Sequence, residues 1–142
     1  WLITQANIPG ELGSLLAPLI ANPTLLMIGM MILVLVVGTA LDFTPTVLIL
    51  TPVLMPLVKQ AGIDPVYFGV LFIVNNAIGL ITPPVGIVLN VVSGVARVSM
   101  TDVMRGVNPF LFTQAIVLFL LIFFPQLVMW PYRLFMGLPF QW

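Results

Sequence analysis

Residues 38–45 read Gly-Thr-Ala-Leu-Asp-Phe-Thr-Pro, and they stand between two apolar runs, residues 25–37 and 46–58. Each run has about 13 residues, which as an α-helix covers roughly 20 Å and falls short of the ~30 Å hydrocarbon core of a bilayer. Two short apolar helices around a polar break favour a re-entrant helical hairpin, which enters and leaves the membrane on one side. The alternative is one long span with a kink.

The composition is that of a membrane protein. Hydrophobic residues make up 61% of the chain and charged residues 6%, and the mean hydropathy is +1.25, whereas a soluble domain carries roughly 25% charged residues. The net charge is zero without a basic or acidic block, so we expect no nucleic-acid partner. The absence of cysteine and histidine excludes disulfides, thiolate nucleophiles and the usual zinc ligands. No nucleophile–base pair is visible, so the sequence does not predict an enzyme.

The chain divides at proline, glycine and charged residues into five segments. The opening Trp-Leu-Ile-Thr lacks the features of a signal peptide, and we interpret the chain as part of a longer protein. Arg97 and Arg105 place the loop between them on the cytoplasmic side. The predicted segments are an interfacial or arm helix (1–22), the re-entrant hairpin (23–61, tip 38–45), a discontinuous transmembrane helix (62–97, break 79–86), a cytoplasmic loop (98–106), and the last transmembrane helix with a periplasmic tail (107–142).

The second break, residues 79–86, reads Gly-Leu-Ile-Thr-Pro-Pro-Val-Gly. Unwound backbone inside a bilayer persists only where it is buried in protein or lines a polar cavity. Carbonyl groups at the end of a half-helix suit a sodium ion, and the N–H groups at the start of the next suit a carboxylate. Thr44 and Thr82 are the residues expected to cap the two second halves. The alternative is that both breaks are merely kinks.

Three polar side chains stand out inside the apolar stretches. A carboxylate such as Asp42 at the bilayer centre costs on the order of 3 kcal/mol and needs a partner. That partner is a bound cation, a polar group of a solute, or, if Asp42 is only an N-cap, the backbone N–H groups of the following helix. Asn75 and Asn76 either hydrogen-bond between helices or line a cavity.

These stretches together resemble the large membrane subunit of tripartite ATP-independent periplasmic (TRAP) transporters. The resemblance is carried by residues 38–45, by Pro52 and Pro56, by the Gly-Ile-Asp-Pro-Val-Tyr-Phe-Gly of residues 62–69, and by residues 75–86. Pro109-Phe110 before a long apolar helix also fits. The likeness covers nearly the whole chain and corresponds to the second of the two inverted repeats of that subunit.

The resemblance implies an elevator-type sodium symporter of the bacterial inner membrane, multi-pass and all-α. Such a protein transports an organic acid anion, for example a C4-dicarboxylate, a keto acid or sialic acid. Its partners are a periplasmic substrate-binding protein, a small four-helix membrane subunit, the remaining N-terminal half of the large subunit, and membrane lipid. Na+ is expected at Gly38, Thr39, Gly79, Thr82, Pro83 and Gly86, mostly through backbone carbonyls, and the substrate at Asp42, Thr44 and Thr82.

Two other functions compete with this interpretation. A divalent-anion:sodium symporter that works without a binding protein has the same architecture, but its hairpin tips usually carry Ser-Asn-Thr, which this sequence lacks. A structural membrane subunit that transports nothing predicts that Asp42→Ala is neutral.

Overall fold

The computed structural model describes residue 14 and residues 16–82 and 86–137. These residues form helices and no strand, which confirms the prediction of an all-α membrane protein. Three of the helices, α3, α4 and α7, are long and apolar enough to cross a membrane by length and composition. The elements are η1 (Ala17–Leu19), α3 (Pro23–Ala40), α4 (Phe43–Gln60), α5 (Pro65–Leu80), α6 (Ile87–Ala96), α7 (Met100–Phe123) and α8 (Gln126–Met136).

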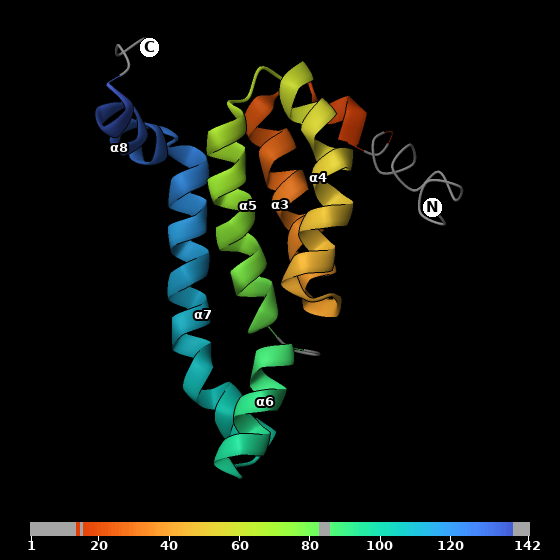
Figure 1. Cartoon of the computed structure of the whole chain (residues 1–142), viewed down its shortest axis with the longest axis vertical. Coiled ribbons are helices and arrows are strands. Elements are labelled where there is room, and N and C mark those ends of the chain that lie inside the picture. The colour runs from red at the N-terminus through yellow and green to blue at the C-terminus, as the bar shows by residue number, and fades with distance from the viewer. Residues whose placement is uncertain (1–13, 15, 83–85, 138–142) are drawn as a thin grey trace.

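Helices α3 and α4 form the hairpin, with Leu41 and Asp42 as its turn. Pro23 opens α3 at a position where a missing N–H costs nothing. Each helix has 18 residues, or roughly 27 Å at 1.5 Å per residue, so each is longer than its apolar run. Since the two arms lie side by side (Figure 1), the alternative of one long, kinked span is wrong.

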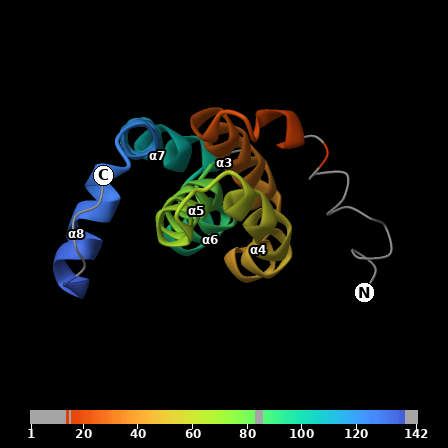
Figure 2. The same ribbon diagram turned by 90° about the horizontal axis from the view of Figure 1, so that it is seen from above.

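Helix α5 is the centre of the packing. It contacts α3, α4, α6, α7 and α8, and its most extensive contact is with α3. Leu26 and Met30 of α3, Leu54 of α4, and Phe68 and Leu71 of α5 are buried in the shared core. Viewed from above, α5 lies beside α3, α4 and α7, and α8 points away to one side (Figure 2).

The helix after the hairpin is interrupted. Asp64 caps the start of α5 by accepting hydrogen bonds from the backbone N–H groups of Val66 and Tyr67. Helix α5 ends at Leu80 and α6 begins at Ile87. The hairpin tip lies at about the level where α5 ends, whereas α6 and the first part of α7 extend beyond it (Figure 1).

The predicted loop 98–106 is wrong over most of its length. Helix α7 begins at Met100, because the Ser99 hydroxyl accepts a hydrogen bond from the backbone N–H of Asp102, at 3.2 Å, and caps the helix. Charged residues such as Arg105 do not distinguish a loop from a helix that extends out of the apolar region.

The last helix also differs from its predicted bounds. Helix α7 ends at Phe123, and the chain then bends at Pro125 into α8. Pro125 has no N–H to donate to the Leu121 carbonyl one turn earlier. The Tyr67 hydroxyl of α5 donates to that oxygen instead, at 2.9 Å, and also lies 3.1 Å from the Ile122 carbonyl. Helix α7 is therefore interrupted where the Tyr67 hydroxyl of α5 supplies the hydrogen bond that the Leu121 carbonyl would otherwise lack.

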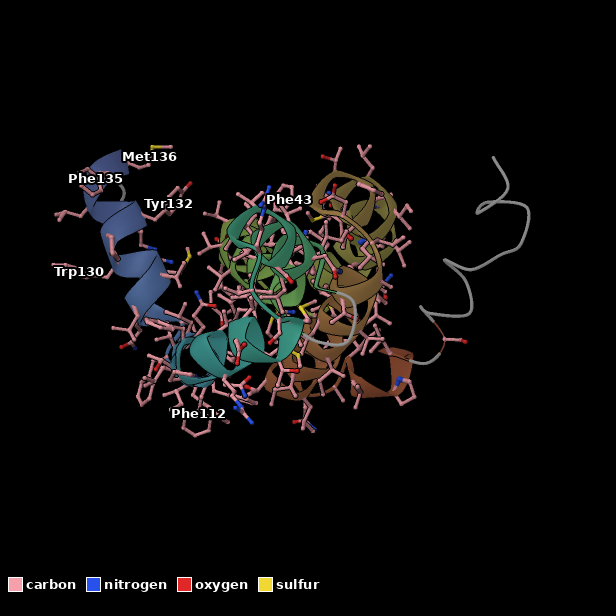
Figure 3. The ribbon with its side chains drawn as sticks, turned by 90° about the horizontal axis from the view of Figure 1, so that it is seen from below. Phe43, Phe112, Trp130, Tyr132, Phe135 and Met136 are labelled. Carbon is pink, nitrogen blue, oxygen red and sulfur yellow. The ribbon has the colours of Figure 1, made fainter. Side chains whose placement is uncertain are left out.

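The two ends of the chain were predicted to lie at the membrane interface. Most of segment 1–22 lies outside the described residues. The described part of this segment contains the short helix η1. At the other end, Trp130, Phe135 and Met136 of α8 are exposed, and α8 lies beside the helical bundle (Figure 3).

Candidate functional site

The two helix breaks meet at a pair of glycines. A Cβ atom added to Gly79 would lie 2.9 Å from the carbonyl carbon of Gly38 and 3.1 Å from its Cα. A Cβ atom added to Gly38 would lie 2.8 Å from the Oδ1 atom of Asn76. Both glycines are buried. The last turns of α3 and α5 therefore cross with backbone against backbone, a distance that only glycine allows.

At the crossing, the carbonyl oxygen of Gly38 lies close to Gly79. The carbonyl of Val37 accepts from the N–H of Leu41 at 2.8 Å, but the carbonyl of Gly38 accepts no hydrogen bond from any described residue. That oxygen lies 3.2 Å from the position of a Cβ on Gly79. Since the end of α3 also carries the negative end of its dipole, this is a place where positive charge is favoured.

Thr82 and Gly86 lie beside this crossing on the second break. The Thr82 hydroxyl donates to the Ile78 carbonyl at 2.6 Å, so its oxygen lone pairs remain available. A Cβ on Gly86 would lie 3.3 Å from the Thr82 carbonyl oxygen. Gly86 precedes α6 with φ +38°, in the left-handed region that favours glycine. Thr82 was expected to cap α6, but Gly86 occupies the N-cap position and that expectation is wrong.

Asp42 and Thr44 lie at the exposed tip of the hairpin. Asp42 is the N-cap of α4, and its Oδ1 atom accepts from the backbone N–H of Phe43 at 2.8 Å. The prediction that Thr44 caps α4 is wrong, because α4 already begins at Phe43. Thr39, in the last turn of α3, donates its hydroxyl proton to the Val36 carbonyl at 2.8 Å. Pro83, the remaining predicted site residue, lies outside the described residues.

Two buried amides join the hairpin to α5. Asn75 donates from Nδ2 to the carbonyl of Met31, at 2.5 Å, in the middle of α3. Asn76 donates from Nδ2 to the carbonyl of Phe43, at 3.5 Å, at the start of α4. Both side chains are fully buried, and both Oδ1 atoms have no hydrogen-bond partner. Sequence reasoning left their role open, although two adjacent amides inside an apolar helix were the available signal.

The donor set decides which ions fit. Within the described part of the chain, no group of three or more acidic, histidine or cysteine side chains could hold a metal ion. The oxygens near the crossing belong to backbone carbonyls, a hydroxyl and an amide. These neutral, hard donors suit a monovalent cation such as sodium better than a tightly held divalent metal.

The comparisons with known proteins agree with one another. The model of the family described as "Tripartite ATP-independent periplasmic transporter, DctM component" matches residues 1–127. The chain is 55% identical over 133 residues to the 2,3-diketo-L-gulonate TRAP transporter large permease protein YiaN of Escherichia coli (strain K12), with 94% of this chain and 31% of that relative covered. It is 37% identical over 137 residues to the sialic acid TRAP transporter large permease protein SiaM of Vibrio cholerae, with 96% and 32% covered.

A third relative extends the range of named substrates. The C4-dicarboxylate TRAP transporter large permease protein DctM of Pseudomonas aeruginosa is 32% identical over 124 residues, with 87% of this chain and 29% of that relative covered. The chain thus spans about a third of the length of the curated relatives it matches. Since the family model matches most of the chain, the chain belongs to the DctM-component family of tripartite ATP-independent periplasmic transporters.

Proposed function

We propose that the protein to which this chain belongs is a sodium-coupled symporter of an organic acid anion. The observation that carries the proposal is the meeting of the two helix breaks at Gly38 and Gly79. Membership in the family makes the chain a multi-pass protein of the inner membrane, and its named relatives are transporter permeases rather than enzymes. Because the chain spans about a third of the length of its curated relatives, the proposed transport is assigned to a subunit of their full length.

Sodium would be held at the crossing. The unbonded carbonyl of Gly38, the carbonyls of Thr39 and Gly79, and the oxygens of Thr82 are the donors that this chain supplies, with Pro83 and Gly86 on the same break. Backbone oxygens hold the ion without a full opposing charge, so it can be released on the other side of the membrane.

The substrate would bind at the hairpin tip. In the first turn of α4, Pro45 has no N–H and Thr46 donates to the Asp42 carbonyl. The Thr44 N–H and the positive end of the helix dipole remain to favour the carboxylate of an organic acid. Asp42 uses one oxygen for the N–H of Phe43, and its second oxygen would accept from hydroxyl groups of the solute. Thr44 would donate its hydroxyl proton to the anion, and Thr82 would do so by giving up its bond to the Ile78 carbonyl.

The helix levels support one position of the hairpin in the membrane. The hairpin tip ends where α5 ends, while α6 and α7 extend farther (Figure 1). This arrangement favours a hairpin that re-enters the membrane and stops near its middle, as in the second repeat of an elevator-type transporter. The complete transporter would also contain the remaining part of the large subunit, a small four-helix membrane subunit and a periplasmic substrate-binding protein. Membrane lipid would surround its membrane part.

Uptake by the reconstituted full-length complex tests the proposal. The first substrate to try is 2,3-diketo-L-gulonate, named for a relative of 55% identity, followed by sialic acid and a C4-dicarboxylate. Each is measured with a sodium gradient and with an equal potassium gradient. Uptake that is independent of sodium would contradict sodium coupling.

Asp42→Asn tests the site itself. Asparagine is as good an N-cap as aspartate, so the substitution removes the charge and leaves the helix start intact. We expect uptake to be abolished and expression to be normal. Asp64→Asn is the control, because Asp64 is also a helix N-cap, that of α5 at the other end of the bundle, and it should transport normally. Wild-type uptake by Asp42→Asn would rule out this role for the hairpin tip.

A further inference from the structure

We infer that Asn76 is a side-chain ligand of the coupling cation, an assignment that rests on the proposed function and adds a residue to it. The side chain is fully buried, and its Oδ1 atom has no hydrogen-bond partner. An unpartnered amide oxygen in a protein interior is destabilising, and in native structures such an atom calls for an explanation. A cation that occupies the site only during part of the transport cycle provides one.

The direction of the amide follows from its hydrogen bond. The Nδ2 group points to the carbonyl of Phe43 at the start of α4, and a flipped amide would place two acceptor oxygens against each other. The Oδ1 atom therefore faces the end of α3, where it lies 2.8 Å from the position of a Cβ on Gly38. The missing side chain of Gly38 is what makes room for this oxygen.

The residue that this oxygen faces, Gly38, supplies an unbonded backbone acceptor. The carbonyl of Gly38 accepts no hydrogen bond from the described residues, and Gly79 approaches from the same helix as Asn76. Amide and backbone oxygens together are the ligand type that hard cations prefer. Asn76 also contacts both arms of the hairpin, Gly38 on α3 and Phe43 on α4, so an ion held by it would join the two arms at the tip.

Asn75 supplies a matched comparison on the same helix. It is equally buried, it also donates to a backbone carbonyl of the hairpin, and its Oδ1 atom is also unpartnered. However, it bonds Met31, in the middle of α3. It also lines a small cavity of about 90 Å³ whose other lining side chains, among them Ile28, Leu118 and Phe119, are apolar. A cation would find no second oxygen ligand among those side chains.

The test is the sodium-dependent thermal stability of the purified full-length complex, with potassium chloride replacing sodium chloride at constant ionic strength. Sodium alone is the probe, so the readout does not require transport. Asn76→Leu, which removes the oxygen at similar volume, should raise the sodium concentration for half-maximal stabilisation by about tenfold or more. Asn75→Leu should leave that concentration unchanged, although both substitutions lower the melting temperature without sodium.

Asn76→Asp keeps an oxygen in place and adds negative charge, so it should lower the sodium concentration for half-maximal stabilisation. If Asn76→Leu does not yield a folded complex, the Asn76→Asp variant tests the assignment by itself. An unchanged or raised sodium concentration for half-maximal stabilisation then overturns the assignment. Equal sodium responses of the two leucine variants would also overturn it and leave sodium coupling intact. A wild-type complex that sodium does not stabilise would instead overturn the proposed function together with this assignment.

Discussion

Replacing Gly79 with alanine tests the crossing of α3 and α5 directly. The new methyl carbon would lie 2.9 Å from the carbonyl carbon of Gly38, whereas carbon atoms normally pack at about 3.5 Å or more, so the helices must separate by roughly 0.6 Å. The obstacle is backbone, which no rotamer change can move aside. Overpacking of this kind costs about 1–3 kcal/mol, and the shift also displaces the Gly38 carbonyl.

Gly69→Ala is the control for this experiment. Gly69 belongs to the same helix, and a Cβ there would meet no atom within 4 Å. Both substitutions raise helix propensity, by up to about 1 kcal/mol, so the difference between them isolates the collision. Thermal unfolding of the full-length complex should place Gly79→Ala clearly below Gly69→Ala, and only Gly79→Ala should need more sodium for half-maximal uptake. If Gly79→Ala melts no lower than Gly69→Ala and keeps the wild-type sodium dependence, the crossing is not as close as the geometry requires.

Two further substitutions address hydrogen bonds in the same bundle. Tyr67→Phe removes the hydroxyl that donates to the Leu121 carbonyl in place of an N–H on Pro125, and we expect the free energy of unfolding to fall by about 1–3 kcal/mol in thermal unfolding. Tyr132→Phe is the control, because the Tyr132 hydroxyl bonds no described residue, and this variant should melt like the wild type. Equal melting of the two variants would contradict the reasoning. Thr82→Val removes a hydroxyl oxygen at constant shape and should raise the sodium concentration for half-maximal uptake, whereas Thr82→Ser should preserve it; the same sodium dependence in both variants would remove the Thr82 side chain from the site.

The helix breaks could be predicted because their signals are local. Glycine, proline and a charged residue inside an apolar run interrupt a helix wherever it packs, so residues 38–45 and 79–86 were recognisable without a structure. The same reasoning offered both Asp42 and Thr44 as the cap of α4, since both are good capping residues, and only the start of the helix at Phe43 decides for Asp42. It also missed the first turns of α7, where charged residues were read as loop.

The meeting of the breaks could not be predicted in this way. Gly38 and Gly79 look alike in the sequence whether or not they touch, because contact depends on how two helices cross. The role proposed for Asn76 depends on the same crossing. From the sequence alone, an asparagine inside an apolar helix is equally compatible with a hydrogen bond between helices and with a cation ligand. Pro125 likewise stands in an apolar run, and its effect on α7 becomes clear only with the Tyr67 hydroxyl beside Leu121.

The glycine crossing has a mechanical consequence. Packed helices usually slide past one another because interleaved side chains change rotamer and absorb the displacement. At Gly38 and Gly79 that adjustable layer is missing, since main chain touches main chain. At this point the hairpin and α5 therefore cannot shift past one another through rotamer changes alone.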